Sequence, residues 1–554
     1  MKVLAWILGF LAVVIGGILF LIVVNNKQLK SYVFGSIKYR GDVQMSPGNV
    51  NIPIERKLHW KSKSAFGDSI IKIIADKPIT DEMLLKKGIT IRILLARLAL
   101  KQGIPEVNRI LRKLTVWGNC GSSWQMNPLG DYDFPLTNLT TILWMFGEQE
   151  SIIYPETKKY LLDVILSEDG SNFSYTVPKT LGLVMETENH MLMTEGSRYL
   201  KNRWIREHGN LNDYYHNEKN GMEEKLLSLM GEMNRNGLYE FNSLPYIGYT
   251  ITALLNLEAY ASEKVRAEAR NVLDYLNWSY ALNSYHLKHY PPMRRRYEKA
   301  SITELTTDYH SAFMKSWLSF SSIQNYDKNV GVATVHAMVG AIMPYRPADK
   351  VLEVLFNKED GYFIRQGHGP KASPEISSAG KNFLISAGGV NRGRRSLIVS
   401  RPICLYLNDS SDDLSEIIHL AGPGNDFMLW NNTGVYENFA CAARPVNIPE
   451  DFTTLSNNGN WSVYLKNGVT IVVYSTDSLG LFAVFEGMDP PSIFERVLKE
   501  NPDPEVLKNR FKFPNGPLLE LDVFAEKHQW VMVAKDGEKL NRDFDSWPLI
   551  QGDL

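Results

Sequence analysis

The residues of this sequence that could do chemistry include an adjacent asparagine and histidine, with a tyrosine further along the chain. Asn189 and His190 follow the acidic segment Glu186-Thr187-Glu188, and Tyr246 follows the turn-like segment Asn236-Gly237-Leu238-Tyr239-Glu240. An amide and an imidazole can bind a carboxylate, and a phenol can give a proton to a leaving oxygen. Together these groups suit proton abstraction beside a carboxylate followed by elimination, the chemistry that cleaves acidic polysaccharides.

A purely structural explanation of the first two residues is also open. Asn189 and His190 stand where a loop meets a helix that the apolar pattern predicts over 190–207. Asparagine is favoured at helix N-caps, so its amide could serve the helix, with His190 buried behind it. The acidic residues before the pair, Glu186 and Glu188, favour the functional interpretation because they could orient the imidazole or bind sugar hydroxyls.

The tyrosine is expected at the start of a second helix. Asn236-Gly237 is a strong turn signal, and Pro245 suits the first turn of a helix. Tyr246 and Tyr249 are one helical turn apart and therefore share a face of this helix. Either ring could pack in a core, but Tyr246 is closer to the helix start and better placed to project into a cleft.

Several charged and aromatic residues could bind the rest of an acidic substrate. The basic run 294–296 could form an anion subsite or a solvated turn, and His310 could be a second imidazole in the cleft or a core residue. Arg365 and His368 could reach over the mouth of the helical region from the start of the β region. The predicted catalytic residues are Asn189, His190 and Tyr246, and the predicted substrate-binding residues are Glu188, Glu240, Tyr249, Arg296, His310, Arg365 and His368.

The overall composition argues against one class of ligand. The chain has 554 residues, with 60 Lys and Arg and 61 Asp and Glu, which gives a formal net charge of −1. Nucleic-acid-binding proteins usually carry a basic excess, so no nucleic-acid partner is expected. The three cysteines, Cys120, Cys404 and Cys441, lack zinc-site spacing. A Cys404–Cys441 bridge is an open alternative, but free thiols are predicted, with no metal or cofactor.

The first residues decide the expected compartment. Residues 3–24 contain no charge and are rich in Leu, Ile and Val, and about 20 such residues span the hydrocarbon core of a membrane. No small-residue cleavage site follows at 23–26. The sequence therefore predicts an uncleaved single-pass membrane anchor in residues 1–26, with a signal peptide as the alternative. A body that acts on glycans would lie outside the cytoplasm, in the periplasm or the extracellular space.

The remaining pattern predicts an α+β multidomain chain, with a connector at 27–80, a helical domain at 81–330 and a β domain at 345–554. Repeated amphipathic helix pairs predict an (α/α) toroid, and short alternating runs predict an antiparallel β-sandwich with a helical insertion at 489–510. The predicted helices cover 83–101, 104–116, 136–146, 154–166, 190–207, 222–233, 245–261 and 263–280. The predicted strands cover 362–366, 381–386, 395–399, 461–465, 469–475, 481–486 and 529–534.

The order of these motifs resembles that of a known enzyme group. Asn-His, a long helical stretch, then Asn-Gly-x-x-Glu and Tyr is similar to the toroid-plus-sandwich polysaccharide lyases, the alginate lyase and heparinase II/III-like group. The resemblance covers the helical domain and the domain order. It implies that Asn189 and His190 neutralise a uronate carboxylate and that Tyr246 protonates the glycosidic oxygen. An acidic polysaccharide is then the expected substrate, and the reaction needs no cofactor.

Two other functions remain open from the sequence. A glycoside hydrolase needs two carboxylates on either side of the scissile bond, and Glu188, Glu240 and either Asp131 or Asp133 could supply them. A non-catalytic glycan-binding protein of the cell envelope could also use this fold, because a fold by itself does not determine a function. The product of the reaction separates these alternatives.

Overall fold

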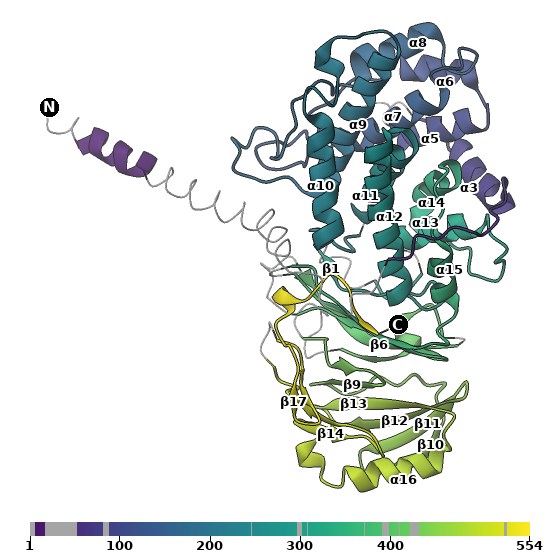
Figure 1. The fold of residues 1–554 in the computed structure, drawn as a ribbon, viewed down its shortest axis with the longest axis vertical. Helices are drawn as coiled ribbons and strands as arrows, with labels where there is room; N and C mark the ends of the chain where they lie inside the picture. The colour runs from purple at the N-terminus through teal and green to yellow at the C-terminus, as the bar shows by residue number, and fades with distance from the viewer. Residues whose placement is uncertain are drawn as a thin grey trace.

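The computed structural model describes most of the chain after residue 51. The described residues are 6–16, 52–80, 83, 88–244, 246–295, 302–306, 308–369, 372–390, 398–408, 410–421, 431–525 and 529–553. Helices form the earlier part and antiparallel sheets the later part (Figure 1). The predicted combination of a helical region followed by a β region is therefore confirmed.

The helical part runs from α3 to α15. Each of the eight predicted helical ranges overlaps a helix, and α3 lies within the range that was predicted as a connector. Local sequence explains the helix starts: the Ser64 side chain accepts the Gly67 N–H at the start of α3, and Asp308 caps α13 through Ser311. The helices are α3 (Ala65–Ala75), α5 (Gly88–Ala99), α6 (Ile104–Leu111), α7 (Asp133–Phe146), α8 (Pro155–Tyr160) with a π-helical turn at Leu161–Ile165, α9 (Glu188–Glu207), α10 (Met222–Asn236), α11 (Tyr246–Tyr260), α12 (Glu263–Asn283), α13 (Tyr309–Leu318), α14 (Thr334–Ile342) and α15 (Asp349–Phe356).

Neighbouring helices contact one another in an order that returns to its start. α3 contacts α5, α5 contacts α7, α7 contacts α9 and α9 contacts α11. α11 then contacts α13, α13 contacts α14, and α14 contacts α3 again. The buried apolar side chains of these helices form one continuous core. Within this arrangement α7, α9 and α11 all contact one another, so residues at their ends can share a site.

The later part consists of antiparallel sheets. Their strands are β1 (Met293–Arg294), β2 (Tyr362–Gln366), β3 (Glu375–Gly380), β4 (Phe383–Gly388), β5 (Ile398–Val399), β6 (Arg401–Leu407), β7 (Ile418–Leu420), β8 (Val435–Tyr436), β9 (Phe439–Ala442), β10 (Thr454–Asn458), β11 (Trp461–Lys466), β12 (Val469–Ser475), β13 (Gly480–Glu486), β14 (Arg510–Lys512), β15 (Leu518–Leu521), β16 (Met532–Lys535), β17 (Glu538–Lys539) and β18 (Gln551–Asp553). Two six-stranded sheets have the orders β18-β2-β3-β4-β6-β7 and β10-β11-β12-β13-β9-β8. A four-stranded sheet has the order β14-β15-β16-β17, and β1 pairs with β5.

The sheet that contains β6 lies between the helices and the second six-stranded sheet (Figure 1). Successive strand residues point to opposite faces. Ile403 and Leu405 accordingly join the core shared with the second sheet, whereas Cys404 and Tyr406 join the core of the helical part. Because both faces of β6 are covered, this strand is buried along its whole length.

Most predicted strands are present, two with the predicted ends. β2 and β12 cover the predicted residues, and β4, β11, β13 and β16 overlap their predicted ranges. β5 lies at the end of the predicted range 395–399, whose first three residues lie outside the described residues. The insertion predicted at 489–510 contains helix α16 (Pro490–Glu500), which is capped by Asp489. β6 was not predicted, since a strand buried on both faces has no alternation of polar and apolar residues. All three cysteines are buried free thiols, as predicted.

Only part of the predicted membrane anchor is described. Residues 6–16 form a helix with exposed side chains, and the remainder of 3–24 lies outside the described residues. No helix in the described part of the chain is long and apolar enough to cross a membrane.

Candidate active site

The predicted catalytic residues lie in the first turns of two helices, next to the start of a third helix. Asp133 begins α7, Glu188 begins α9 and Tyr246 begins α11. The first N–H groups of a helix have no partner within the helix, and its N-terminus carries partial positive charge. Since α7, α9 and α11 contact one another, this end of the helical part suits a negatively charged ligand.

Asn189 does not cap its helix. The N-cap of α9 is Thr187, with an extended backbone, so Asn189 lies inside the first turn. The Thr187 hydroxyl donates to Asn189 Oδ1. The amide Nδ2 is buried and has no hydrogen-bond partner among the described residues. A buried donor without a partner costs free energy, and a ligand oxygen could accept from it.

His190 is held as an imidazolium by a buried carboxylate. Its Nδ1 lies 2.6 Å from Oδ2 of Asp133, and both side chains are buried. Burial lowers the pKa of His190, but the charge and hydrogen bond of Asp133, helped by Glu186 and Asp131, raise it to about 10. Because Asp133 occupies Nδ1, a ligand would be bound through Nε2. His190 is therefore protonated at neutral pH, with its charge balanced by Asp133 and its Nε2–H available as a donor.

Tyr246 lies between the imidazole and a guanidinium. The ring centroids of Tyr246 and His190 are 6.4 Å apart, and the Arg295 guanidinium carbon is 5.2 Å from the Tyr246 ring centroid. Arg295 also forms an ion pair with Glu240. Burial lowers the pKa of Arg295, but the Glu240 carboxylate more than reverses this and raises it. The neighbouring residue Arg296, predicted to bind substrate, lies outside the described residues.

Glu188 and Glu240 form a buried carboxylate pair. Glu188 Oε1 accepts the backbone N–H of Glu240 at 2.6 Å, and both side chains are almost fully buried. Burial, followed by the charge of Glu240, raises the pKa of Glu188, against the opposing effects of that N–H and of Arg294. These two residues therefore join the start of α9 to the turn after α10 and contact each other.

Tyr249 lies in a group of rings one turn after Tyr246. Its ring centroid is 4.3 Å from that of Phe134 and 5.3 Å from that of His336. The Arg92 guanidinium carbon lies 4.8 Å from the same centroid. This surrounding of rings and a cation gives Tyr249 a packing role next to the predicted catalytic residues.

His368 reaches the neighbourhood of the site from the β part. Its ring stacks on Phe241 with centroids 4.1 Å apart, and its Nε2 lies 2.9 Å from Glu375 Oε1. The same carboxylate oxygen accepts from the Asn242 amide at 2.5 Å. His368 is thus held against the turn that directly follows Glu240.

Two other residues predicted to bind substrate have partners outside this cluster. His310 Nε2 lies 2.9 Å from Asn277 Oδ1, and burial lowers the pKa of His310 to about 3, which keeps its ring neutral. The Arg365 guanidinium carbon is 5.3 Å from the ring centroids of both Trp530 and Trp547. His310 thus contacts a residue of α12, and Arg365 contacts aromatic rings of the β part.

Sequence reasoning missed two partners that shape the site. It did not assign Asp133 to His190, although an acidic residue before a predicted helix was visible. It also considered Arg295 only as a member of a basic run, without its contacts to Glu240 and Tyr246. Both partnerships join segments that are distant in the sequence, and no local pattern indicates them.

Comparison of the whole chain with models of known protein families, and with curated proteins, found no match.

We expect Glu188→Gln to stabilise the protein at alkaline pH. The raised pKa of Glu188 means that the folded state holds its proton more tightly than the unfolded state does. The resulting stability is fully present below the pKa that Glu188 has in the unfolded state, and it is lost as the pH rises through the pKa that Glu188 has in the folded state. Glutamine does not titrate and keeps an acceptor for the Glu240 N–H. Melting temperatures should agree at pH 4, below the ordinary glutamate pKa, and the variant should be higher by about 2 °C at pH 9.

A neighbouring glutamate provides the matched control for this experiment. Both oxygens of Glu186 accept hydrogen bonds, from the Ser122 hydroxyl and N–H and from the Thr187 N–H. Glu186→Gln should therefore lower the melting temperature at both pH values, since an amide cannot accept all of these bonds at full strength. A constant difference between Glu188→Gln and the natural chain at every pH would contradict the assignment.

Proposed function

We propose that this protein is a polysaccharide lyase that cleaves a uronate-containing glycan by β-elimination. The observation that carries the proposal is the grouping of an imidazolium, a buried amide donor without a partner among the described residues, and a phenol. These are His190, Asn189 and Tyr246, at the first turns of α9 and α11. All three groups can act on a carboxylate-bearing sugar, and none of them needs a cofactor.

The proposed role of His190 and Asn189 is to offset the negative charge of the uronate carboxylate. The proton on the adjacent carbon is weakly acidic, and its removal places further charge on the carboxylate oxygens. An imidazolium and an amide N–H at those oxygens stabilise this intermediate. Asp133 supports the role because it keeps His190 positively charged, at a pKa of about 10, against the effect of burial.

The proposed role of Tyr246 is proton transfer, first as base and then as general acid. Its phenolate takes the proton from the carbon beside the carboxylate, and the phenol then gives that proton to the departing oxygen as the carbon–oxygen bond to the leaving sugar breaks and a carbon–carbon double bond forms in the uronate. The guanidinium of Arg295, 5.2 Å from the ring centroid, can stabilise the phenolate that remains. Arg295 is itself fixed by its ion pair with Glu240.

The architecture supports the same proposal. The helix contacts that lead from α3 through α14 and back to α3 are those expected of an (α/α) toroid, and two sheets that share a core are expected of a β-sandwich. This is the domain order of the alginate lyase and heparinase II/III-like group. We also propose that residues 3–24 anchor the protein in a membrane, with the body outside the cytoplasm.

The carboxylates give less support to a glycoside hydrolase. Glu188 and Glu240 contact each other in the interior, and Glu240 is paired with Arg295. Asp133 is bonded to His190. A hydrolase needs its two carboxylates on opposite sides of the scissile bond, about 5–9.5 Å apart. The hydrolase and a non-catalytic glycan-binding role are therefore the competing outcomes of the test.

The test is a spectroscopic assay on the full-length chain in detergent. The protein is incubated with alginate, polygalacturonate, hyaluronan, unsulfated chondroitin, heparosan and heparin, and absorbance of unsaturated uronate is recorded together with new reducing ends. A lyase produces both signals on at least one glycan. Reducing ends without absorbance would replace the lyase by a hydrolase. Neither signal, together with measurable binding, would favour the binding protein.

A further inference from the structure

A pocket extends along α9 away from the proposed reaction centre. It encloses about 1070 Å³, part of it open to solvent, and its walls include His190, Thr194, Glu195 and Arg198. These positions recur at helical spacing and so lie on one face of α9. At 1.5 Å per residue, His190 and Arg198 are about 12 Å apart along the helix axis, which is longer than one pyranose ring.

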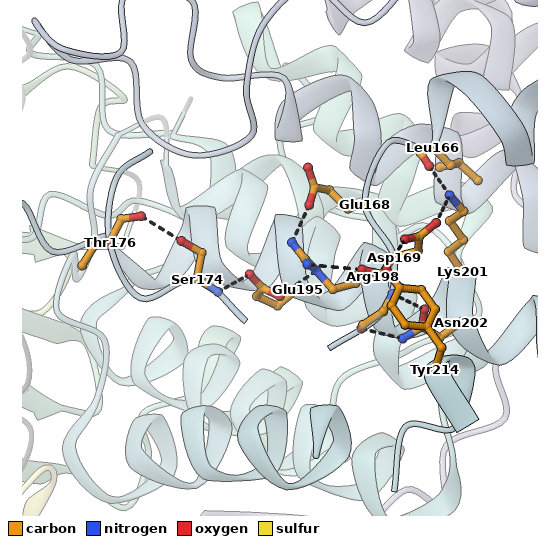
Figure 2. A network of polar contacts seen from close by, with 11 residues as sticks. Leu166, Glu168, Asp169, Ser174, Thr176, Glu195, Arg198, Lys201, Asn202 and Tyr214 are labelled. Carbon is orange, nitrogen blue, oxygen red and sulfur yellow. Dashed lines mark hydrogen bonds and ion pairs between the residues drawn. The ribbon is translucent and has the colours of Figure 1, made fainter. Parts of the chain in front are cut away.

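The far end of the pocket is built from buried ionic contacts. Arg198 is 4% exposed and forms ion pairs with Glu168 and with Glu195, whose Oε2 lies 3.0 Å from its Nε (Figure 2). Arg198 Nη1 donates to the backbone oxygen of Asp169 at 3.3 Å. Glu195 Oε1 accepts the Ser174 N–H at 2.8 Å. The charge of Arg198 is therefore already balanced by two carboxylates.

One hydroxyl on this wall has no partner in the part of the chain that the structure describes. Thr194 is 6% exposed and lines the pocket between His190 and Arg198. Its Oγ1 is buried and makes no hydrogen bond with any described residue. Buried hydroxyls are normally hydrogen-bonded, so this atom indicates a ligand group on the pocket side.

We propose that this pocket holds the sugar next to the uronate and that this sugar is neutral. The inference rests on the proposed lyase function and narrows its substrate to glycans in which uronate alternates with an uncharged hexose or N-acetylhexosamine. Sugar hydroxyls can donate to the carboxylates of Glu195 and Glu168 and pair with the hydroxyl of Thr194. A sugar that carried an acid group would place another negative charge next to those carboxylates. It would be repelled, because the charge of the Arg198 guanidinium is already neutralised by them.

A competing anionic occupant would need another cation. Lys179 also lines the pocket, and its side chain is exposed at the rim. If the sugar carried a carboxylate or sulfate, Lys179 would be the group that binds it. Variants of Thr194 and of Lys179 therefore separate the two occupants.

The experiment measures binding of defined tetrasaccharides by calorimetry in the full-length Tyr246→Phe background, in which turnover is slowed by about 10²–10⁴-fold. The probes are hyaluronan, unsulfated chondroitin and heparosan tetrasaccharides, alginate tetrasaccharide and a sulfated chondroitin tetrasaccharide. The work is done at pH 8, above the pKa of about 7 to which burial raises Glu195 against Arg198. At least one alternating unsulfated probe should bind about tenfold more tightly than the alginate probe.

The variants identify the pocket as the origin of this preference. Thr194→Val should weaken binding of the preferred probe about fivefold and Glu195→Gln about tenfold, as expected for a neutral and a charge-assisted hydrogen bond. The matched control is Thr157→Val, which removes another buried hydroxyl without a partner among the described residues, on α8. It should leave binding unchanged.

Four results would overturn the inference. The first is binding of the alginate or sulfated probe that is as tight as, or tighter than, binding of the unsulfated alternating probes, and the second is no binding of any unsulfated alternating probe. The third is a loss of binding caused by Lys179→Ala but not by Thr194→Val. The fourth is an equal loss of binding in Thr194→Val and Thr157→Val. Unsaturated product from polyuronates alone would keep the lyase and reject the neutral-sugar pocket. Selective binding that depends on Thr194, without unsaturated product from the natural chain, would keep the pocket and reject the lyase.

Discussion

Tyr246→Phe should reduce the rate of unsaturated-uronate formation by about 10²–10⁴-fold, the usual contribution of a general acid. The change removes one oxygen and keeps the ring, so the ring contacts with His190 and with the Arg295 guanidinium remain. Binding of the carboxylate is assigned to other residues. The loss should therefore fall on kcat with little change in KM, because the phenol acts in the transition state.

Tyr249→Phe is the matched control for this variant. It removes the same oxygen one helical turn later, from a ring packed against Phe134, His336 and Arg92. Its rate should stay within about threefold of the natural chain, since surface and packing changes of this size are small. Melting temperatures of both variants establish that they are folded. Equal losses in both, or full activity in Tyr246→Phe, would remove Tyr246 from the mechanism.

Local sequence patterns were sufficient to predict most of the helices and the helix starts that carry the site residues. The turn signal at Asn236-Gly237 placed Tyr246 at the start of α11, where the structure has it. The Asn-His pair was expected at the loop before α9, and it lies in the first turn of that helix. Helix starts depend on capping and turn residues close in sequence, and this is why these positions could be predicted.

Those local patterns could not predict the pairings between segments that are distant in the sequence. The bond between His190 and Asp133 joins two helix starts, and the ion pair of Arg295 with Glu240 joins two loops. Their distances depend on how the helices pack, which no local spacing encodes. β6 was missed for a related reason: its burial on both faces is a consequence of the sheet order, and a continuous apolar run of this length is ambiguous by itself.

Burial also changed the interpretation of the predicted substrate-binding residues. Glu188 and Glu240 looked from the sequence like groups free to contact a sugar, but in the interior Glu188 accepts the backbone N–H of Glu240, and the Glu240 carboxylate pairs with Arg295. Arg365 was predicted as a residue that could reach over the mouth of the helical part, and its guanidinium lies near Trp530 and Trp547. A charged residue in a strand-like run gives no sign of which face it occupies until the register of the sheet is known.

Asp133→Asn should lower kcat/KM at pH 8 by about 10²–10³-fold, the range found when one donor to a developing oxyanion is lost. In the natural protein Asp133 raises the pKa of His190 to about 10 against burial. With asparagine in its place, burial dominates and the imidazole is neutral at pH 8. Protonated His190 also stabilises the fold, and this stability is fully present below about pH 6.5 and lost as the pH rises through about 10. This contribution to the free energy of unfolding should decrease in Asp133→Asn as well.

The pH profile distinguishes this mechanism from a general disturbance of the site. The basic limb of kcat/KM that belongs to His190 should move from about pH 10 in the natural chain to below pH 7 in Asp133→Asn. Asp131→Asn is the control, because Asp131 contributes less to the same pKa and its carboxylate accepts from the Ser123 N–H instead. Its profile should stay within a few tenths of a pH unit of the natural one, since asparagine tolerates the left-handed backbone at this position.

NMR titration of the His190 ring in both variants measures the shift directly. An unchanged titration in Asp133→Asn would show that Asp133 does not hold the charge on His190, and the carboxylate-binding role would then have to rest on Asn189 alone.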